Sequence, residues 1–232
     1  MTLSPDEIIY RIGPWEVNAT LLFTWVVMAL LVGAAAIARR GFKVEPPIGR
    51  AQLVFEALVT FVLDQIRYVT RQEPRRYLPF AGTLFLFILT CNVLPIVPGF
   101  EPPTGSLSTT AALALAVFFA VPAFGISKLG LRGYLRTYLE PTPLMLPFTV
   151  LGEITRTLAL AVRLFGNMMS NTMLVAILLL IAPLVFPMLM QGLGLLFGVV
   201  QAYIFTVLAL VYIASGTTEA EKRTARGTGE TA

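Results

Sequence analysis

The sequence predicts an all-α integral membrane protein, because its composition is too apolar for a soluble fold and its apolar residues form long runs. Hydrophobic residues make up 56% of the 232 residues and charged residues only 13%, whereas an ordinary globular domain carries about 25% charged residues. A soluble fold cannot bury that much apolar surface, so lipid must cover part of it.

Five apolar runs are long enough to cross a hydrocarbon core that needs about 20 residues. They predict about five transmembrane helices within a single membrane domain, residues 1–216, at 18–38, 77–97, 108–126, 144–181 and 183–214. A helix over either of the last two runs extends roughly 50 Å, against a core of about 30 Å. We therefore expect these two helices to form a long, strongly tilted hairpin, with its turn near Pro183.

Residues 48–71 are less apolar and carry an amphipathic pattern. Polar residues recur at helical spacing from Gln52 to Arg71, and apolar residues occupy the other side. This pattern predicts a helix that lies in the membrane interface, and packing against a soluble partner is the alternative. The polar residues 217–232 are expected to form a disordered cytoplasmic tail.

The net charge of +4 is distributed in short patches of Lys and Arg beside the apolar runs. Cations are frequent after the first run and at 128–136, and absent from 98–107, which predicts a periplasmic N-terminus and a cytoplasmic C-terminus. No continuous basic face indicates nucleic acid as a partner, so membrane lipids are the expected surroundings. The chain has one cysteine and no histidine, so we expect no intrachain disulfide, no metal site and no cofactor.

Arg163 lies inside the fourth apolar run, with LALAV before it and LF after it. An arginine at the bilayer centre costs about 2.5–3.5 kcal/mol on insertion scales, and its guanidinium stays charged. No Asp or Glu occurs between Ile154 and Gly216. The counter-charge must therefore come from another polypeptide, or water must fill a cavity beside this residue. Snorkelling to the interface or bonding to backbone carbonyls is the alternative.

Further polar residues accompany this arginine on the last two runs. Arg156 lies seven residues earlier, on the same helical face, although its place near the helix start also suits snorkelling. The face continues toward the hairpin turn with three polar residues, Asn167, Ser170 and Asn171. The fifth run carries a complementary stripe of Gln191, Gly194, Gly198 and Gln201. Such glycines let a neighbouring helix approach closely, and the glutamines can line a polar path.

The stretch RTLALAVRLFGNMMSN, residues 156–171, resembles the arginine-bearing helix of subunit a of F-type ATP synthases. Two other stretches agree with this resemblance. NVLPIVPGFEPPTGSLSTTAALAL, residues 92–115, is similar to the family's loop and following helix, and QAYIFTVLALVYI, residues 201–213, to its last helix. Together with the order of the apolar runs, the resemblance covers nearly the whole chain.

The resemblance implies a stator in the bacterial inner membrane, around which a ring of c subunits rotates. Arg163 matches the arginine that faces the ion-binding carboxylate of each passing c subunit, Gln201 the polar residue opposite it, and Asn167 the asparagine of the same motif. Two offset half-channels would connect that carboxylate to the two sides of the membrane, and b subunits of the peripheral stalk are further partners. The chain has no P-loop and no nucleophile–base pair, so no catalytic site is expected in it.

Two positions depart from the family's proton-conducting members. Thr172 and Gly194 stand where many of those members carry an acidic residue and a histidine, so the chain resembles the bacterial N-type variant. The coupling ion is H+ or Na+. The residues expected to line its path are neutral: Asn167, Ser170, Asn171, Thr172, Gln191 and Gln201. If the ion is H+, Glu101 and Glu153 are the acidic residues that could take part in the path. A secondary transporter with an anion site at Arg163 and a structural assembly factor are the alternatives.

Overall fold

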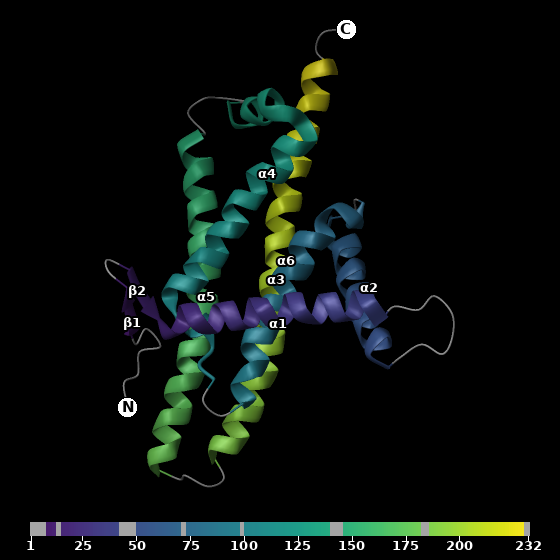
Figure 1. Ribbon diagram of the computed structural model, residues 1–232. Coiled ribbons are helices and arrows are strands. Elements are labelled where there is room, and N and C mark those ends of the chain that lie inside the picture. Colours follow the sequence, from purple (N-terminus) through teal and green to yellow (C-terminus); the bar gives the residue numbers. More distant parts are fainter. Residues whose placement is uncertain are drawn as a thin grey trace.

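A computed structural model of the protein describes residues 8–12, 15–41, 50–70, 73–97, 100–139, 146–181 and 186–229. The chain forms a short β-hairpin followed by long helices (Figure 1). The elements in chain order are β1 (Ile8–Ile12), β2 (Trp15–Asn18), α1 (Ala19–Gly41), α2 (Arg50–Thr70), α3 (Pro74–Val93), the 3-10 turns η1 (Leu94–Ile96) and η2 (Pro103–Gly105), α4 (Leu107–Leu139), α5 (Leu146–Ile181) and α6 (Phe186–Gly229).

Within these described residues, five helices are long and apolar enough to cross a membrane. Their candidate spans are Ala19–Ile37, Pro74–Ile96, Leu107–Lys128, Pro147–Leu180 and Met188–Gly216, in α1, α3, α4, α5 and α6. The predicted all-α, multi-pass membrane fold is therefore confirmed. The antiparallel β1–β2 hairpin, which precedes α1 directly, is an addition that the apolar pattern did not predict.

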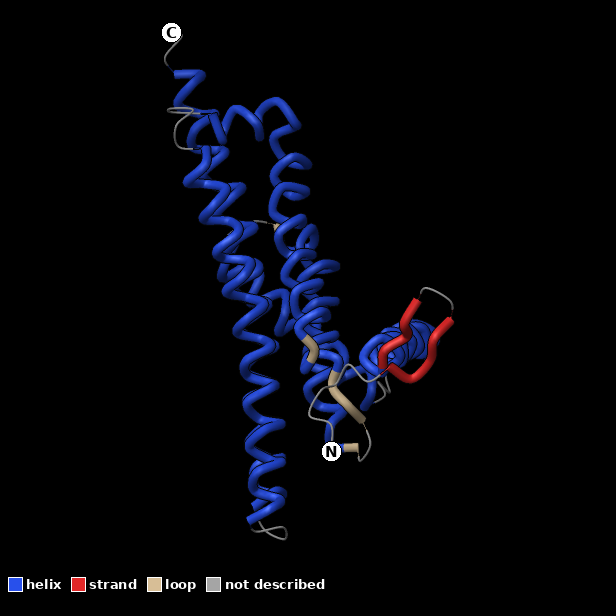
Figure 2. Tube along the Cα trace, turned by 90° about the vertical axis from the view of Figure 1, so that its left-hand side faces the viewer, coloured by secondary structure: helices blue, strands red, loops and turns tan. Residues whose placement is uncertain are grey.

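The core of the molecule lies where α6 packs against α2, α3, α4 and α5. Figure 2 shows these long helices running side by side as one elongated body. The largest fully buried side chains come from all five helices and include Phe205, Leu210, Ile213, Ile88, Val117, Leu160, Leu164 and Ile66. On α3, for example, the buried residues Ala81, Leu84, Phe85 and Ile88 follow one another at helical spacing, so that one apolar face of the helix enters the core.

α5 contributes only one narrow face to this core. Leu160, Ala161, Leu164 and Met168 are buried, at the spacing of one helical stripe. Most apolar residues outside that stripe are exposed or half-buried; Leu158, for example, has 62% of its surface accessible. An apolar helix face that the chain itself leaves open must meet lipid or another polypeptide.

α1 lies across the long axis of the α5–α6 pair rather than beside it (Figure 1). Its 19-residue span is about 28 Å long, which matches a hydrocarbon core of about 30 Å when the helix is upright. The 34-residue span of α5 is about 51 Å long and fits the same core only when tilted by about 54°. Because α1 crosses α5 and α6 in Figure 1, these helices can take different angles to the same bilayer.

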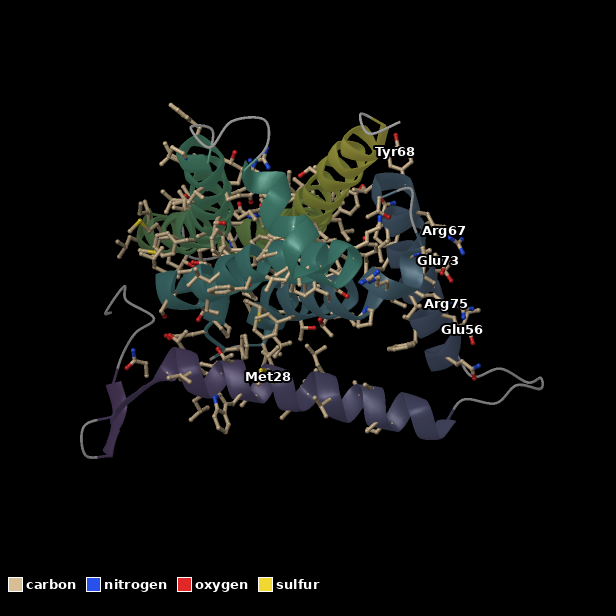
Figure 3. The ribbon with its side chains drawn as sticks, turned by 90° about the horizontal axis from the view of Figure 1, so that it is seen from above. Met28, Glu56, Arg67, Tyr68, Glu73 and Arg75 are labelled. Atoms are coloured by element: carbon tan, nitrogen blue, oxygen red, sulfur yellow. The ribbon has the colours of Figure 1, made fainter. Side chains whose placement is uncertain are left out.

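α2 is the helix that the amphipathic pattern predicted, and it lies across the C-terminal end of α1 (Figures 1 and 3). Val62 and Ile66 are buried against the bundle, whereas Tyr68 is 84% exposed. Figure 3 shows Glu56, Arg67, Glu73 and Arg75 gathered along this one edge of the molecule. Its placement at the membrane interface stays a prediction, and the position of α2 beyond the end of α1 agrees with it.

α4 bends sharply near its end, where Gly130 adopts φ 74° inside the run Leu107–Leu139. A residue with a side chain rarely adopts this left-handed conformation, so glycine suits the bend. Beyond it, the chain turns back and Tyr134 packs directly over Gly125, where a Cβ atom would lie 2.6 Å from Tyr134 Cδ2. Arg76 at the start of α3 donates a hydrogen bond to the Ser127 hydroxyl, which ties α3 to the same region.

The ends of α5 and α6 bear on two of the predictions made from the sequence. α6 continues to Gly229, so residues 217–229 extend the helix, and the prediction of a disordered tail there is wrong. The helix continues because residues 217–226 contain no proline or glycine to stop it. The turn predicted at Pro183 lies outside the described residues, which resume at Phe186.

The lengths of α1 and α5 generate a prediction about their orientation in a bilayer. We expect the α5–α6 pair to lie at about 50° or more from the membrane normal and α1 to lie near it. Electron cryomicroscopy of the assembled complex in lipid nanodiscs measures both angles. An upright α5–α6 pair with a strongly tilted α1 would contradict the length argument.

Candidate functional site

The polar residues of α5 form one continuous edge along the helix. Arg156, Arg163 and Ser170 follow one another at intervals of seven residues, and all three are exposed. Asn167, one turn from Arg163, is half-buried at the border between this edge and the buried stripe. Three residues of the predicted face therefore lie together and point away from the core that Leu160 and Leu164 anchor, whereas Asn171, also predicted on this face, lines a pocket instead.

Arg163 has no ion pair and no hydrogen bond with any other residue that the structure describes. It is exposed on a helix whose surrounding residues are apolar. Because no described side chain neutralises its guanidinium, the counter-charge must lie outside the described residues. The geometry thus favours a partner polypeptide or water beside Arg163 over a hydrogen bond to the chain's own carbonyls.

Arg156 differs from Arg163 because it is held by two neighbours. Its Nη1 atom lies 3.4 Å from Oε1 of Glu153, one turn earlier on α5. Its guanidinium carbon also lies 5.4 Å from the centre of the Tyr212 ring on α6, which is a cation–π contact. Since both partners belong to this chain, Arg156 has an evident structural role in joining α5 to α6.

Gln201 lies in the core of α6 and is only 6% exposed. Its Nε2 atom is fully buried and finds no hydrogen-bond partner among the described residues. A buried amide without a partner costs about 1–3 kcal/mol, so a water or an outside group is expected to reach it. No hydrogen bond joins Gln201 to Arg163 in the described part of the chain, so their predicted pairing stays a prediction.

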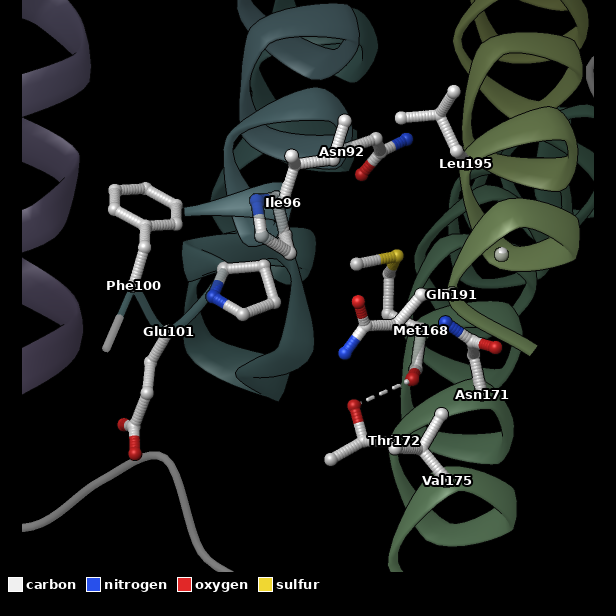
Figure 4. Close-up of a pocket in the computed structure, with 13 residues that line it drawn as sticks. Asn92, Ile96, Phe100, Glu101, Met168, Asn171, Thr172, Val175, Gln191 and Leu195 are labelled. Atoms are coloured by element: carbon white, nitrogen blue, oxygen red, sulfur yellow. Dashed lines mark hydrogen bonds between the residues drawn. The ribbon is translucent and has the colours of Figure 1, made fainter. Parts of the chain in front are cut away.

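Three of the predicted residues meet in a pocket of about 230 Å³ (Figure 4). The pocket lies between the end of α3 with its following loop on one side and α5 and α6 on the other. Asn171 and Thr172 enter it from α5, and Gln191 from α6. The rest of its lining includes Asn92, Ile96, Phe100, Glu101, Met168, Val175, Gly194 and Leu195.

The polar atoms of this pocket are almost all neutral. The Thr172 hydroxyl donates to the backbone carbonyl of Met168, at 3.0 Å, and keeps its oxygen lone pairs free. Glu101 is the one charged residue of the lining, and its carboxylate is turned away from Thr172 and Gln191 in Figure 4. Amide and hydroxyl oxygens are groups that can replace water around a cation.

Asn92, which the sequence pattern did not single out, anchors the inner wall of the pocket. Its Nδ2 atom donates to the backbone carbonyl of Gly198 at 2.8 Å, and its Oδ1 atom accepts from the Thr104 hydroxyl at 3.1 Å. Asn92 and Thr104 are both buried, with 5% and 0% of their surfaces exposed, respectively. In the sequence, the signal that could have identified Asn92 is its place as a polar residue at the end of the apolar second span, just before the proline-rich stretch around Glu101.

The predicted site residues thus fall into three groups. Arg156, Arg163 and Ser170 form the exposed edge of α5, with Asn167 beside it. The pocket unites Asn171, Thr172 and Gln191, and Gln201 lies in the core. No group of three or more His, Cys, Asp or Glu side chains suited to a metal occurs among the described residues.

The fold and this arrangement define a class of protein, a multi-pass helical membrane protein that exposes, on a long apolar helix, a guanidinium that no described residue neutralises. Comparison with known proteins then identifies the family. The family model of the ATP synthase A chain matches residues 21–214, and the chain belongs to this family.

Relatives of this family are similar over nearly their whole length. The chain is 58% identical to ATP synthase subunit a 1 of Chlorobaculum parvum, over 97% of this chain and 100% of the relative. It is 56% identical to ATP synthase subunit a 2 of Picosynechococcus sp., over 96% of both chains. It is 54% identical to ATP synthase subunit a of Albidiferax ferrireducens, over 94% of both chains. The resemblance to subunit a seen in the sequence is confirmed.

The Asn92 network generates a prediction about stability. Asn92→Ala leaves the Thr104 hydroxyl and the Gly198 carbonyl buried without their partner, a loss of about 1–3 kcal/mol for each group. Differential scanning fluorimetry of the purified complex should show a lower unfolding temperature. Thr83→Ala, on the exposed side of the same helix, removes a hydroxyl that, among the described residues, bonds to carbonyls of α3 itself and should leave that temperature unchanged. Equal temperatures for both variants would contradict the anchoring role.

Proposed function

We propose that this chain is the ion-translocating stator subunit a of a rotary ATP synthase or ATPase, in which Arg163 faces the ion-binding carboxylate of each passing c subunit. The observation that carries this proposal is the exposed Arg163, unpaired within the described residues, on a helix face that the bundle leaves open. Membership in the ATP synthase A chain family supports it. A carboxylate on a neighbouring polypeptide is the counter-charge that this guanidinium lacks.

The mechanism is electrostatic. A guanidinium close to a carboxylate favours its charged form and so lowers the carboxylate's pKa. Each c-subunit carboxylate would release its ion as it reaches Arg163 and take up a new one after passing it. Because the guanidinium keeps its own charge at every accessible pH, it also repels cations and blocks a direct leak between the two half-channels.

Two separate ion paths can flank Arg163 along α5. Thr172 of the pocket lies nine residues after Arg163, and Glu153 ten residues before it. These spacings correspond to about 14 Å and 15 Å along the helix. We assign the pocket to the half-channel open to the periplasm and the Glu153–Arg156 side to the half-channel open to the cytoplasm, since the cation distribution places residues 98–107 outside.

Several further features belong to the same proposal. The partners are the c ring, opposite Arg163, and the b subunits of the peripheral stalk, with lipid around the remaining apolar faces. The protein resides in the bacterial inner membrane with its N-terminus in the periplasm and its C-terminus in the cytoplasm. It carries out no catalysis itself, and ATP is made or hydrolysed in another part of the complex.

The pocket's composition weighs against the alternative of a secondary transporter with an anion site at Arg163. Arg163 does not line the pocket, whose one charged residue, Glu101, is negative. A cavity with neutral oxygens and one carboxylate attracts cations rather than anions.

The first test is substitution of Arg163. Arg163→Ala should abolish ATP-driven ion uptake into vesicles, while the complex still assembles, because the side chain is exposed and makes no hydrogen bond or ion pair with another described residue. Arg163→Lys should also fail, since a compact, strongly hydrated ammonium differs from the planar guanidinium. Arg75→Ala, which removes an exposed arginine at the start of α3, is the matched control and should retain uptake. Coupled uptake at the native rate in Arg163→Ala would end the proposal.

The second test concerns the coupling ion, for which we propose sodium over protons. The pocket residues brought by α5 and α6 are neutral, and neutral oxygens suit a partly dehydrated Na+. Millimolar sodium should stimulate ATP hydrolysis by the purified complex at neutral or alkaline pH. Sodium should also protect the ring carboxylate from carbodiimide labelling. ATP-driven acidification in sodium-free vesicles, without either sodium effect, would identify H+ as the coupling ion.

A further inference from the structure

The start of α3 and the end of the α4 span meet at one level of the bundle. Arg76, on the first turn of α3, donates a hydrogen bond to the hydroxyl of Ser127 on α4, 51 residues later in the chain. The candidate span of α3 begins at Pro74, and that of α4 ends at Lys128. The contact therefore lies where both helices leave the apolar layer, and Lys128, which follows Ser127 directly, adds a second cation at the same end.

The Arg76 guanidinium has donors left for a further group. The residue is exposed, and the Ser127 hydroxyl is its one hydrogen-bond partner within the described part of the chain. A guanidinium carries five N–H donors. Glu73, three residues earlier, forms no ion pair with it among the described residues. Arg76 therefore offers a positive charge that α4 orients and that no described carboxylate neutralises.

The surface that continues from this contact into the apolar layer is exposed and uncharged. Going inward, the next exposed residues are Pro79 and Thr83 on α3 and Ala123 and Phe119 on α4. They follow at steps of three or four residues, so they share one face of each helix with Arg76 and Ser127. Phe119 has 64% of its surface accessible. Residues 77–93 and 107–127 contain no Asp, Glu, Lys or Arg.

A charge at the boundary followed by an open apolar face matches the order of groups in a phospholipid. The phosphate of a phospholipid lies at the interface, and its acyl chains enter the hydrocarbon core. The distribution of cations predicts that this end of the spans faces the cytoplasm. Basic sites between transmembrane helices on that side attract anionic headgroups.

We propose that Arg76, together with Lys128, binds the phosphate of an anionic phospholipid of the cytoplasmic leaflet, whose acyl chain covers the exposed face of α3 and α4. A guanidinium pairs with phosphate oxygens through two parallel N–H bonds, and the Ser127 hydroxyl holds it in place. The inference goes beyond the proposed function, because it involves neither Arg163 nor the pocket.

Arg75 is a matched control for Arg76. It carries the same charge on the same turn of α3 and is also exposed. Figure 3 shows it along the edge of the molecule that also carries Glu56 and Glu73. Successive residues of a helix point about 100° apart, so Arg75 shares the charge of Arg76 but not its contact with α4.

The test is photo-crosslinking of the whole complex in phosphatidylcholine nanodiscs with a small share of probe lipid. The probe is phosphatidylglycerol or phosphatidylcholine with a diazirine in an acyl chain, and mass spectrometry counts the adducts on residues 76–83 and 119–127. The native complex should give a ratio of phosphatidylglycerol to phosphatidylcholine adducts well above one. Arg76→Ala should lower this ratio about fivefold, the factor that one cation near an anionic headgroup contributes, whereas Arg75→Ala should keep it.

Two further variants separate lipid binding from a tie between the helices. Arg76→Gln keeps a donor for Ser127 but removes the charge, so it should lower the ratio as much as Arg76→Ala does. Ser127→Ala removes the hydrogen bond but keeps the charge, so its ratio should stay above that of Arg76→Gln. A residue that only tied α3 to α4 would give the opposite order.

Three outcomes overturn the inference. The first is an equal number of adducts from both lipids in the native complex, which means that the site does not select anionic headgroups. The second is a native ratio in Arg76→Ala and Arg76→Gln, which means that this charge does not hold the lipid. The third is a lack of adducts from either lipid on this face, which means that another polypeptide covers it.

Discussion

The guanidinium of Arg163 is the constraint on which the rest of this structure depends. It cannot lose its charge, and insertion at the middle of an apolar helix costs about 2.5–3.5 kcal/mol. The described part of the fold offers no acidic partner to it, although the neighbouring Arg156 receives both Glu153 and Tyr212. Within the described residues Arg163 is thus left without a partner, whereas a similar residue seven positions earlier on the same helix is paired, and the proposed function supplies the missing counter-charge.

The packing of α5 keeps that interface open. One stripe, with Leu160 and Leu164 fully buried, supplies the attachment to the bundle, and the remaining surface of the helix stays accessible. α6 complements this arrangement from the core: Gly194 and Gly198 give space to Asn171 and Asn92, and the buried Gln201 amide keeps a free donor. Polar groups are thus held beside the exposed edge without neutralising it.

Helix length links this site to the membrane. α5 and α6 are far longer than an upright crossing needs, and α1, which matches the thickness of the core, lies across them (Figure 1). A tilted pair exposes a long stretch of α5 within the bilayer, so that residues on either side of Arg163 can communicate with opposite surfaces.

The sequence by itself determined the fold class, the five spans and the shared helix face of Arg156 and Arg163, because apolar length and helical periodicity are local properties of the chain. It also carried the resemblance to the family, through RLFGN at residues 163–167. Only the tertiary structure decided that Arg156 is paired and Arg163 is not, that Asn92 anchors α6, and that Asn171 lies over Gly194. Apart from the pair of Arg156 with Glu153, each of these contacts joins residues from different elements. Such contacts depend on how two helices are rotated and crossed relative to each other, and the periodicity within one helix does not specify that.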